Sequence, residues 1–103
     1  MLNINERETE DGTVLDLEGS VVMGSGSTEL RNALRRLAEQ SKNRITINFA
    51  AVKYIDSSGV GELINAATTF NNAGGSLKLA NLPPKVEQVL SLSNVISMFE
   101  IEE

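Results

Sequence analysis

Residues 54–61 read Tyr-Ile-Asp-Ser-Ser-Gly-Val-Gly, and they separate two segments with different hydrophobic periodicity. Before them, residues 44–49 (RITINF) alternate apolar and polar side chains, which predicts a β-strand. After them, apolar residues recur at helical spacing, at Val60, Leu63, Ile64, Ala67 and Phe70. The sequence therefore predicts a strand followed by an amphipathic helix, with short polar residues and glycines where the helix begins.

The polar side chains of this stretch suit the first turn of a helix. Asp56, Ser57 or Ser58 can accept hydrogen bonds from backbone N–H groups that have no partner within the helix. Gly59 and Gly61 are then expected to allow close packing of the helix against the sheet. This structural interpretation accounts for the stretch without giving it a function.

A β-hairpin is predicted at the start of the chain. Residues 2–9 form a weakly apolar strand, and Glu10-Asp11-Gly12 has the chemistry of a tight turn because Asp-Gly tolerates positive φ. Residues 13–18 form a second strand, which we expect Gly19 to close. The first two elements are therefore expected to pair in an antiparallel manner.

A loop and a first helix are predicted between this hairpin and the central strand. Residues 20–27 contain glycines and serines and are predicted as a loop, after which Ser27 or Thr28 caps the helix. Its apolar stripe consists of Leu30, Ala33, Leu34 and Leu37. Residues 40–43 end it. Arg31, Arg35 and Arg36 lie off the stripe, as a solvated face or a small basic patch for an acidic partner.

The carboxyl-terminal part repeats the alternation of strand and helix. Residues 71–75 end the central helix with two glycines, and residues 76–80 form the next strand. Pro83 and Pro84 precede a third helix, because proline is tolerated at the first helical position. Its apolar face is Val86, Val89 and Leu90. Residues 98–101 are expected to form a short closing strand or a helix end.

The order of elements predicts an α/β fold made of a single domain over residues 1–103. Strands that alternate with helices pair in parallel through right-handed crossovers, and the opening hairpin makes the sheet mixed. Hydrophobic residues make up 41% of the chain and charged residues 22%, which is typical of a globular protein. We expect a mixed sheet of four to five strands.

Composition excludes several classes of chemistry. The chain has no cysteine and no histidine, which excludes disulfides, thiol catalysis, Ser-His-Asp triads and classical zinc sites, so we expect no cofactor and no metal. The net charge of -5 argues against direct binding to nucleic acid. An apolar run of roughly 18 residues and a signal peptide are both missing from the sequence, so we expect a cytoplasmic protein without a membrane segment.

A serine at a helix N-terminus can also act as a switch. Phosphorylation adds roughly -1.5 to -2 charges, which the positive end of the helix tolerates, while a partner docked on the same surface is repelled. The enzymatic alternative, with Ser57 or Ser58 as a nucleophile, needs an activating base. Lys53 is the only nearby amine and is expected to be solvated. We therefore predict a binding protein and not an enzyme.

The stretch Tyr54-Ile-Asp-Ser-Ser-Gly-Val-Gly-Glu-Leu63 resembles the signature of the STAS family, the sulfate-transporter and anti-sigma-factor-antagonist domains. The similarity is greatest to small bacterial anti-sigma-factor antagonists, and it covers essentially the whole chain. It implies a mixed sheet with helices mostly packed on one side. It also implies a protein that binds an anti-sigma factor, itself a GHKL-type serine kinase, and so releases a sigma factor for transcription.

The resemblance also implies roles for individual residues. The kinase phosphorylates the first serine of the motif, Ser57, which breaks the complex, and a PP2C-type phosphatase restores it. Asp56 would shape the kinase contact, Ser58 would help to cap the helix, and Gly59 and Gly61 would keep the surface low for the partner. The residues predicted to bind the partner are Asp56, Ser57, Ser58, Gly59, Val60, Gly61, Met23 and Gly24.

One loop departs from the pattern of many antagonists. They carry Gly-Glu-apolar-Asp after the second strand, whereas here Gly19 is followed by Ser-Val-Val-Met-Gly over residues 20–24. Val21, Val22 and Met23 offer either an apolar docking surface or core residues. An alternative function is a scaffold or accessory STAS domain, in a stressosome-like or lipid-transport complex, without phosphorylation. The expected oligomeric state is a monomer or a weak dimer.

Overall fold

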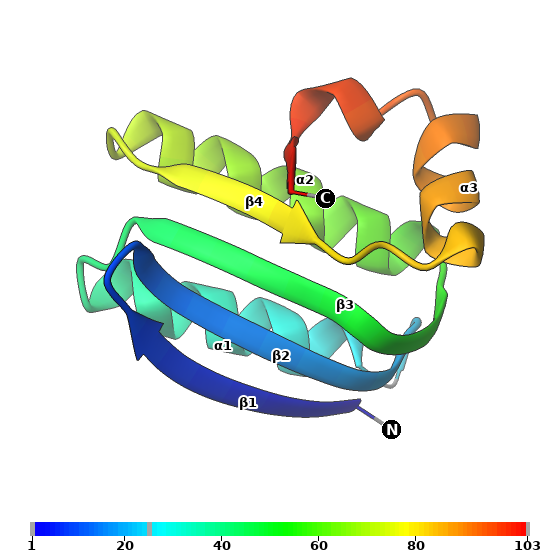
Figure 1. The fold of residues 1–103 in the computed structure, drawn as a ribbon, viewed down its shortest axis with the longest axis horizontal. Coiled ribbons are helices and arrows are strands. Elements are labelled where there is room, and N and C mark those ends of the chain that lie inside the picture. Colours follow the sequence, from blue (N-terminus) through cyan, green and yellow to red (C-terminus); the bar gives the residue numbers. More distant parts are fainter. Residues whose placement is uncertain (1, 25, 103) are drawn as a thin grey trace.

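Strands and helices follow one another in the predicted β-β-α-β-α-β-α-β order (Figure 1). The structure, a computed structural model, describes residues 2–24 and 26–102. Its elements are β1 (Leu2–Thr9), β2 (Gly12–Val21), α1 (Ser27–Glu39), β3 (Arg44–Ile55), α2 (Ser57–Asn72), β4 (Ser76–Ala80), α3 (Pro84–Leu92), the short 3₁₀ helix η1 (Ile96–Met98) and β5 (Glu100–Glu102).

The sheet is mixed, as predicted, and its spatial order β1-β2-β3-β4-β5 is the same as the order along the chain. β1 and β2 form the antiparallel hairpin around the predicted turn. The other neighbours, β2 and β3, β3 and β4, and β4 and β5, pair in parallel. Parallel neighbours need a crossover, and α1, α2 and α3 supply these connections.

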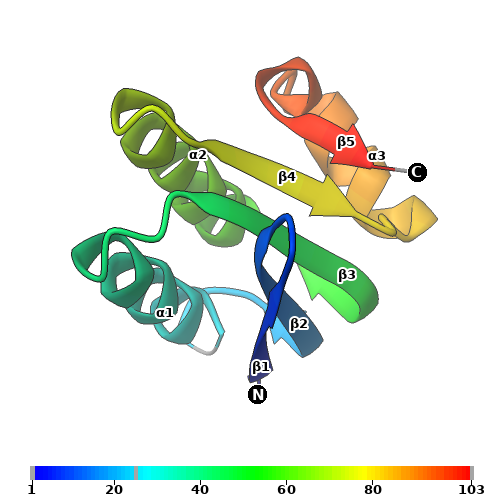
Figure 2. The same ribbon diagram turned by 60° about the vertical axis from the view of Figure 1, so that its left-hand side comes forward.

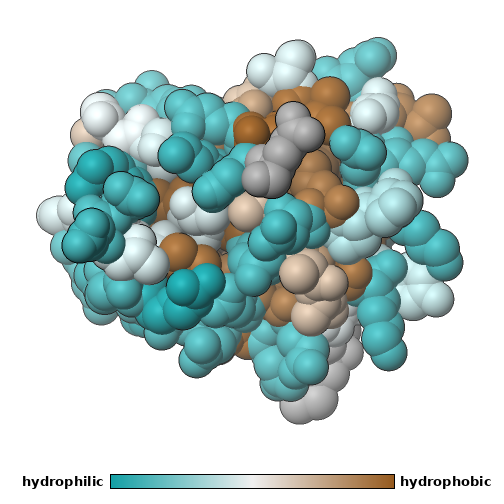
Figure 3. Space-filling view, in the orientation of Figure 1, coloured by the Kyte–Doolittle hydropathy of each residue, from teal (hydrophilic) through white to brown (hydrophobic). Residues whose placement is uncertain are grey.

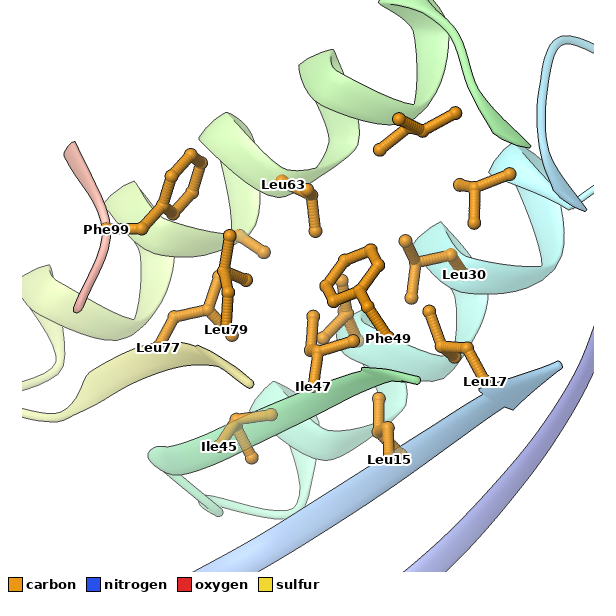
Figure 4. Packing of buried hydrophobic residues seen from close by; sticks show 14 of the residues in the cluster. Leu15, Leu17, Leu30, Ile45, Ile47, Phe49, Leu63, Leu77, Leu79 and Phe99 are labelled. Atoms are coloured by element: carbon orange, nitrogen blue, oxygen red, sulfur yellow. The ribbon is translucent and has the colours of Figure 1, made fainter. Parts of the chain in front are cut away.

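Helices α1 and α2 lie side by side on one face of the sheet (Figure 2). Phe49 of β3 lies between them and points toward Leu30 of α1 and Leu63 of α2 (Figure 4). All three side chains are fully buried. Burial of such a side chain contributes about 1.5–3 kcal/mol, so this layer provides the main hydrophobic stabilisation. Helix α3 lies apart, beyond the carboxyl ends of β3 and β4 (Figure 1).

The opposite face of the sheet carries a chain of polar contacts. The Asp16 carboxylate accepts from Arg7 Nε at 2.6 Å and from Asn48 Nδ2 at 2.8 Å. Asn48 Oδ1 in turn accepts from Asn81 Nδ2 at 2.9 Å. The Arg7 guanidinium is the main cause that holds the pKa of Asp16 below its ordinary value. This face can stay open to solvent because its polar groups pair with one another across the strands.

Two strands are longer than the sequence indicates. Gly19 does not close β2, which continues to Val21, and residues 20 and 21 therefore belong to the sheet and not to a loop. Gly19 has φ 117 and sits at a register shift, which only glycine accommodates readily. The strand continues because β3 also runs on to Ile55 and offers backbone partners to Ser20 and Val21.

The starts of two helices also differ from the prediction. The cap of α1 is Gly26, not Ser27 or Thr28, and the Gly26 N–H donates to Glu29 Oε2 at 2.6 Å. Its φ of 92 explains why a glycine stands there. Helix α2 begins at Ser57, three residues before the apolar periodicity becomes visible, because Asp56 caps it. Ser25 of the predicted loop lies outside the described residues.

The carboxyl-terminal segment covers part of the core and adds exposed apolar surface. Helix α3 begins at Pro84, as predicted, and buries Val86 and Leu90. The closing element is a strand, β5, preceded by η1, and Phe99 between them is buried. Figure 3 shows hydrophobic residues gathered over η1 and β5 on an otherwise mostly hydrophilic face, where Met98 and Ile101 are partly exposed.

Candidate functional site

Ser57 lies at the surface, at the first residue of α2. It follows the end of strand β3, at the carboxyl edge of the sheet, where the buried Ile55 is the last residue of the strand. The backbone N–H groups of the first helical turn and the helix dipole make this end of α2 electropositive. A hydroxyl at this position is accessible to another protein and is placed where added negative charge is tolerated.

Asp56 binds four hydrogen-bond donors and is the centre of the site. Its Oδ1 accepts from the backbone N–H of Ser58 at 3.0 Å, from that of Gly59 at 3.1 Å, and from the Ser58 hydroxyl at 2.6 Å. Its Oδ2 accepts from the backbone N–H of Met23 at 2.9 Å. The sequence interpretation of Asp56 as a possible helix cap is therefore confirmed, and the bond to Met23 is an addition.

These donors favour the charged form of Asp56. Its pKa lies below the ordinary value of 3.8, chiefly because the Ser58 hydroxyl donates to the carboxylate, and next because Met23 donates its N–H. Partial burial acts in the opposite direction, because desolvation disfavours the charge. The carboxylate is therefore ionised at neutral pH, and it holds the helix start and the preceding loop together.

The two serines of the stretch have different surroundings. Ser58 is half-buried, and its hydroxyl is occupied by the bond to Asp56. Ser57 is exposed, and no other described residue hydrogen-bonds its hydroxyl. The role predicted for Ser58 in the helix cap agrees with this geometry. A partner or a modifying enzyme can therefore approach the Ser57 hydroxyl without breaking a hydrogen bond to another described residue.

Gly59 and Val60, two of the residues predicted to bind the partner, are buried in this structure. A Cβ at Gly59 would stand 2.6 Å from the backbone oxygen of Val21, so this glycine allows α2 to pack closely on β2 and does not lower the outer surface. Val60 is 4% exposed and belongs to the core. Gly61 has open space around it and remains compatible with the approach of a partner.

The loop between β2 and α1 brings Met23 to the same surface. Met23 is 76% exposed and Gly24 is exposed beside it, whereas Val21 is fully buried in the core. The sequence left two alternatives for this segment, an apolar docking surface and core residues. The first is compatible with Met23, and the second applies to Val21. The contact between Met23 and Asp56 joins residues 33 positions apart. Periodicity and local motifs cannot reveal it, because both report on neighbours along the chain.

Sequence reasoning also missed the exposed aromatic ring that precedes the site. The Tyr54 side chain is 56% exposed, and Lys85 Nζ of α3 lies 5.4 Å from its ring centroid. This cation–π geometry places the start of α3 next to the end of β3. Lys53 beside it is exposed as well, and the sequence carries no local signal that would pair this ring with a residue 31 positions away.

Two of the three arginines of α1 are paired with carboxylates of neighbouring elements. Arg31 Nη1 lies 3.6 Å from Glu62 Oε2 of α2, and Arg36 pairs with Glu6 of β1 at 3.0 Å. Within residues 2–24 and 26–102, no group of three acidic side chains is placed to hold a metal ion. No helix in those residues combines the length and the apolar character needed to cross a membrane.

Comparison with known proteins identifies the fold and the sequence pattern. The family model described as the STAS domain matches residues 3–103. The anti-sigma-B factor antagonist of Bacillus subtilis strain 168 is 27% identical over 100 residues, which is 97% of this chain and 90% of that protein. The resemblance inferred from residues 54–63 is thus found independently over nearly the full length.

Solved structures show the same architecture. A crystal structure from Thermotoga maritima, of a protein proposed to be an anti-sigma factor antagonist, matches with a TM-score of 0.89 at 22% identity, covering 97% of this chain and 86% of that one. SpoIIAA, described as a Bacillus cell fate determinant, matches in its phosphorylated form with a TM-score of 0.75 at 20% identity, covering 98% and 92%. At these identities the structures establish the fold, which is the predicted one.

Proposed function

This chain belongs to the STAS domain family, and on that premise we propose that it is an anti-sigma factor antagonist switched by phosphorylation of Ser57. The name of the Bacillus subtilis relative supports the first part of the proposal. The existence of SpoIIAA in a phosphorylated form supports the second. In this chain, the observation that carries the proposal is the exposed Ser57 at the first position of α2, beside a carboxylate that already caps the helix.

The physical basis is a change in charge that affects recognition more than folding. A phosphate on Ser57 would project into solvent from an electropositive helix end, so it would change the free energy of unfolding only slightly. A protein docked on the same surface would meet roughly -1.5 to -2 additional charges and a bulky group. The unmodified protein therefore binds, and the phosphorylated protein does not.

The proposed cycle has two enzymes and one regulated complex. Unphosphorylated protein binds an anti-sigma factor that is also a GHKL-type serine kinase, and this binding releases the sigma factor. The kinase then phosphorylates Ser57, and a PP2C-type phosphatase regenerates the binding form. This chain acts in the cytoplasm as a single binding domain, monomeric or weakly dimeric, and performs no catalysis of its own.

Phosphorylation by a GHKL-type kinase from the same genome tests the proposal. The purified protein is incubated with that kinase and ATP, and the products are analysed by intact and peptide mass spectrometry. We expect one phosphate on wild type and on Ser58→Ala, and none on Ser57→Ala. Ser58→Ala is the matched control, because it removes the neighbouring hydroxyl but leaves the exposed one.

Binding of the same kinase gives the second measurement. Calorimetry with the kinase loaded with a non-hydrolysable ATP analogue, so that Ser57 stays unmodified, is expected to show at least about a hundredfold weaker binding for Ser57→Asp, since a charge at the interface can cost several kcal/mol. Stable binding by wild type, together with no modification of Ser57 in the incubation with ATP, would favour the scaffold function instead. Modification of another residue, with Ser57 untouched, would refute the assignment of the switch.

A further inference from the structure

The loop that carries Met23 is anchored on both sides. At its base, Val22 and Gly26 form a β-bridge, and the Ser27 N–H donates to the Val22 carbonyl at 3.2 Å. A Cβ at Gly26 would stand 2.1 Å from the Ser20 carbonyl oxygen, so the loop closes directly against β2. Between these anchors the Met23 side chain is 76% exposed. The loop thus holds a large apolar side chain in water at a defined place.

The Asp56 carboxylate divides its two oxygens between this loop and α2. Oδ1 is fully engaged by the first turn of the helix, through Ser58 and Gly59. Oδ2 accepts from the Met23 N–H at 2.9 Å, and the Asp56 N–H donates to the Val21 carbonyl at 3.2 Å. One residue therefore fixes the loop relative to the helix end that presents Ser57.

We propose that Asp56 is a positioning residue that holds Met23 beside Ser57. One partner then binds the apolar Met23 side chain and at the same time distinguishes unmodified from phosphorylated Ser57. The inference rests on the proposed function and deepens it, because it adds a property of the partner. The partner presents an apolar socket for the Met23 side chain next to the groups that approach Ser57. Burial of a methionine side chain in such a socket is a substantial source of affinity.

Substitution of Asp56 by serine separates positioning from capping. Serine is as good a helix cap as aspartate, but its single oxygen on a shorter side chain cannot also reach the Met23 N–H. Amide hydrogen exchange is then measured by NMR at two positions. In Asp56→Ser we expect the Met23 amide to exchange at least about tenfold faster, the effect of losing a bond to a charged acceptor. The Gly59 amide should remain within about twofold of wild type. An unchanged Met23 amide would overturn the proposal.

A double-mutant cycle tests whether Asp56 acts through Met23 in binding. The probe is the kinase that phosphorylates Ser57, loaded with a non-hydrolysable ATP analogue so that Ser57 stays unmodified. We expect Asp56→Ser to weaken binding about tenfold in the wild-type background and less than about twofold in the Met23→Ala background, because the positioned side chain is then absent. Equal losses in both backgrounds would show that Asp56 acts in another way, and would also overturn the proposal.

A conservative pair tests the chemistry of the socket. Met23→Leu keeps an apolar side chain of similar volume and is expected to bind within about threefold of wild type. Met23→Gln keeps the length and adds a polar group, and should bind at least about tenfold more weakly. Equal binding by both would refute an apolar socket.

Failure of the inference and failure of the proposed function give different results. If the kinase binds and phosphorylates wild type while the Met23 and Asp56 variants bind normally, phosphorylation switching at Ser57 is supported and the positioning role of Asp56 is refuted. If no kinase acts on Ser57, the proposed function falls. The exchange of the Met23 amide still decides in that case whether Asp56 fixes the loop.

Discussion

Helices α1 and α2 both begin with a serine at the carboxyl edge of the parallel strands, yet the two serines differ in exposure. Ser27 is 6% exposed, and its N–H donates to the Val22 carbonyl at 3.2 Å. Ser57 is exposed and is the first residue of a helix that is capped by the Asp56 side chain. The start of α1 instead uses the backbone of Gly26 and the side chain of Glu29. A serine at a helix start is therefore a candidate for modification only where the tertiary structure leaves it accessible.

The largest effect is expected at Gly26, the glycine that caps α1. Gly26→Ala should lower the free energy of unfolding by about 4 kcal/mol, because its Cβ meets the Ser20 carbonyl and its φ of 92 disfavours any other residue. Gly24→Ala is the control, since it also has positive φ but open space, and should cost about 1 kcal/mol. Urea denaturation measures both. A small loss for Gly26→Ala would mean that the start of α1 is not constrained by backbone contact.

Aspartate at the two serines probes their difference in burial directly. Ser27→Asp should cost about 3 kcal/mol, because a carboxylate at this buried position loses its hydration. Ser57→Asp should change stability by less than about 0.5 kcal/mol, as expected for an exposed site. Thermal or urea unfolding followed by circular dichroism compares the two. Similar losses would remove the distinction between the two helix starts.

Removal of each capping side chain compares the two kinds of cap. Asp56→Ala should cost about 2 kcal/mol, the upper range for a helix cap, because it removes acceptors from two backbone N–H groups of α2 and from the loop. Glu29→Ala should cost about 1 kcal/mol, because a single bond to Gly26 is lost. An equal or larger loss for Glu29→Ala would contradict the central role of Asp56.

The smallest effect is expected from pH. The pKa of Asp56 in the folded protein lies below 3.8, so the carboxylate contributes its full stabilisation above that value and loses it as the pH falls through the folded pKa. The stability difference between wild type and Asp56→Asn should therefore be constant from pH 7 to about pH 5 and decrease below about pH 4. A difference that does not depend on pH down to about pH 3 would show that the ionised carboxylate is not what stabilises the site.

Local interactions explain which parts of the fold and site were predictable. Asp56 and the donors of the first turn of α2 lie within three residues, so a motif of short polar residues before an apolar helical repeat limits the cap to Asp56, Ser57 or Ser58, and the structure selects Asp56. The strand at residues 76–80 was predicted with its observed bounds because glycines and a helix end precede it. The length of β2 was underestimated, because its last residues depend on pairing with β3.

The sequence by itself determined the order of the elements, the α/β class and the position of Ser57 at a helix start, because periodicity, turns and caps depend on residues close together in the chain. Tertiary structure alone decided that Ser57 is exposed while Ser27 is buried, that Gly59 packs against Val21, and that Asp56 holds Met23. The approach of Gly59 to Val21 and the hydrogen bond between Asp56 and Met23 each join segments more than thirty residues apart. They exist only after the parallel pairing of β2 and β3 has brought the β2–α1 loop and the start of α2 to the same edge of the sheet.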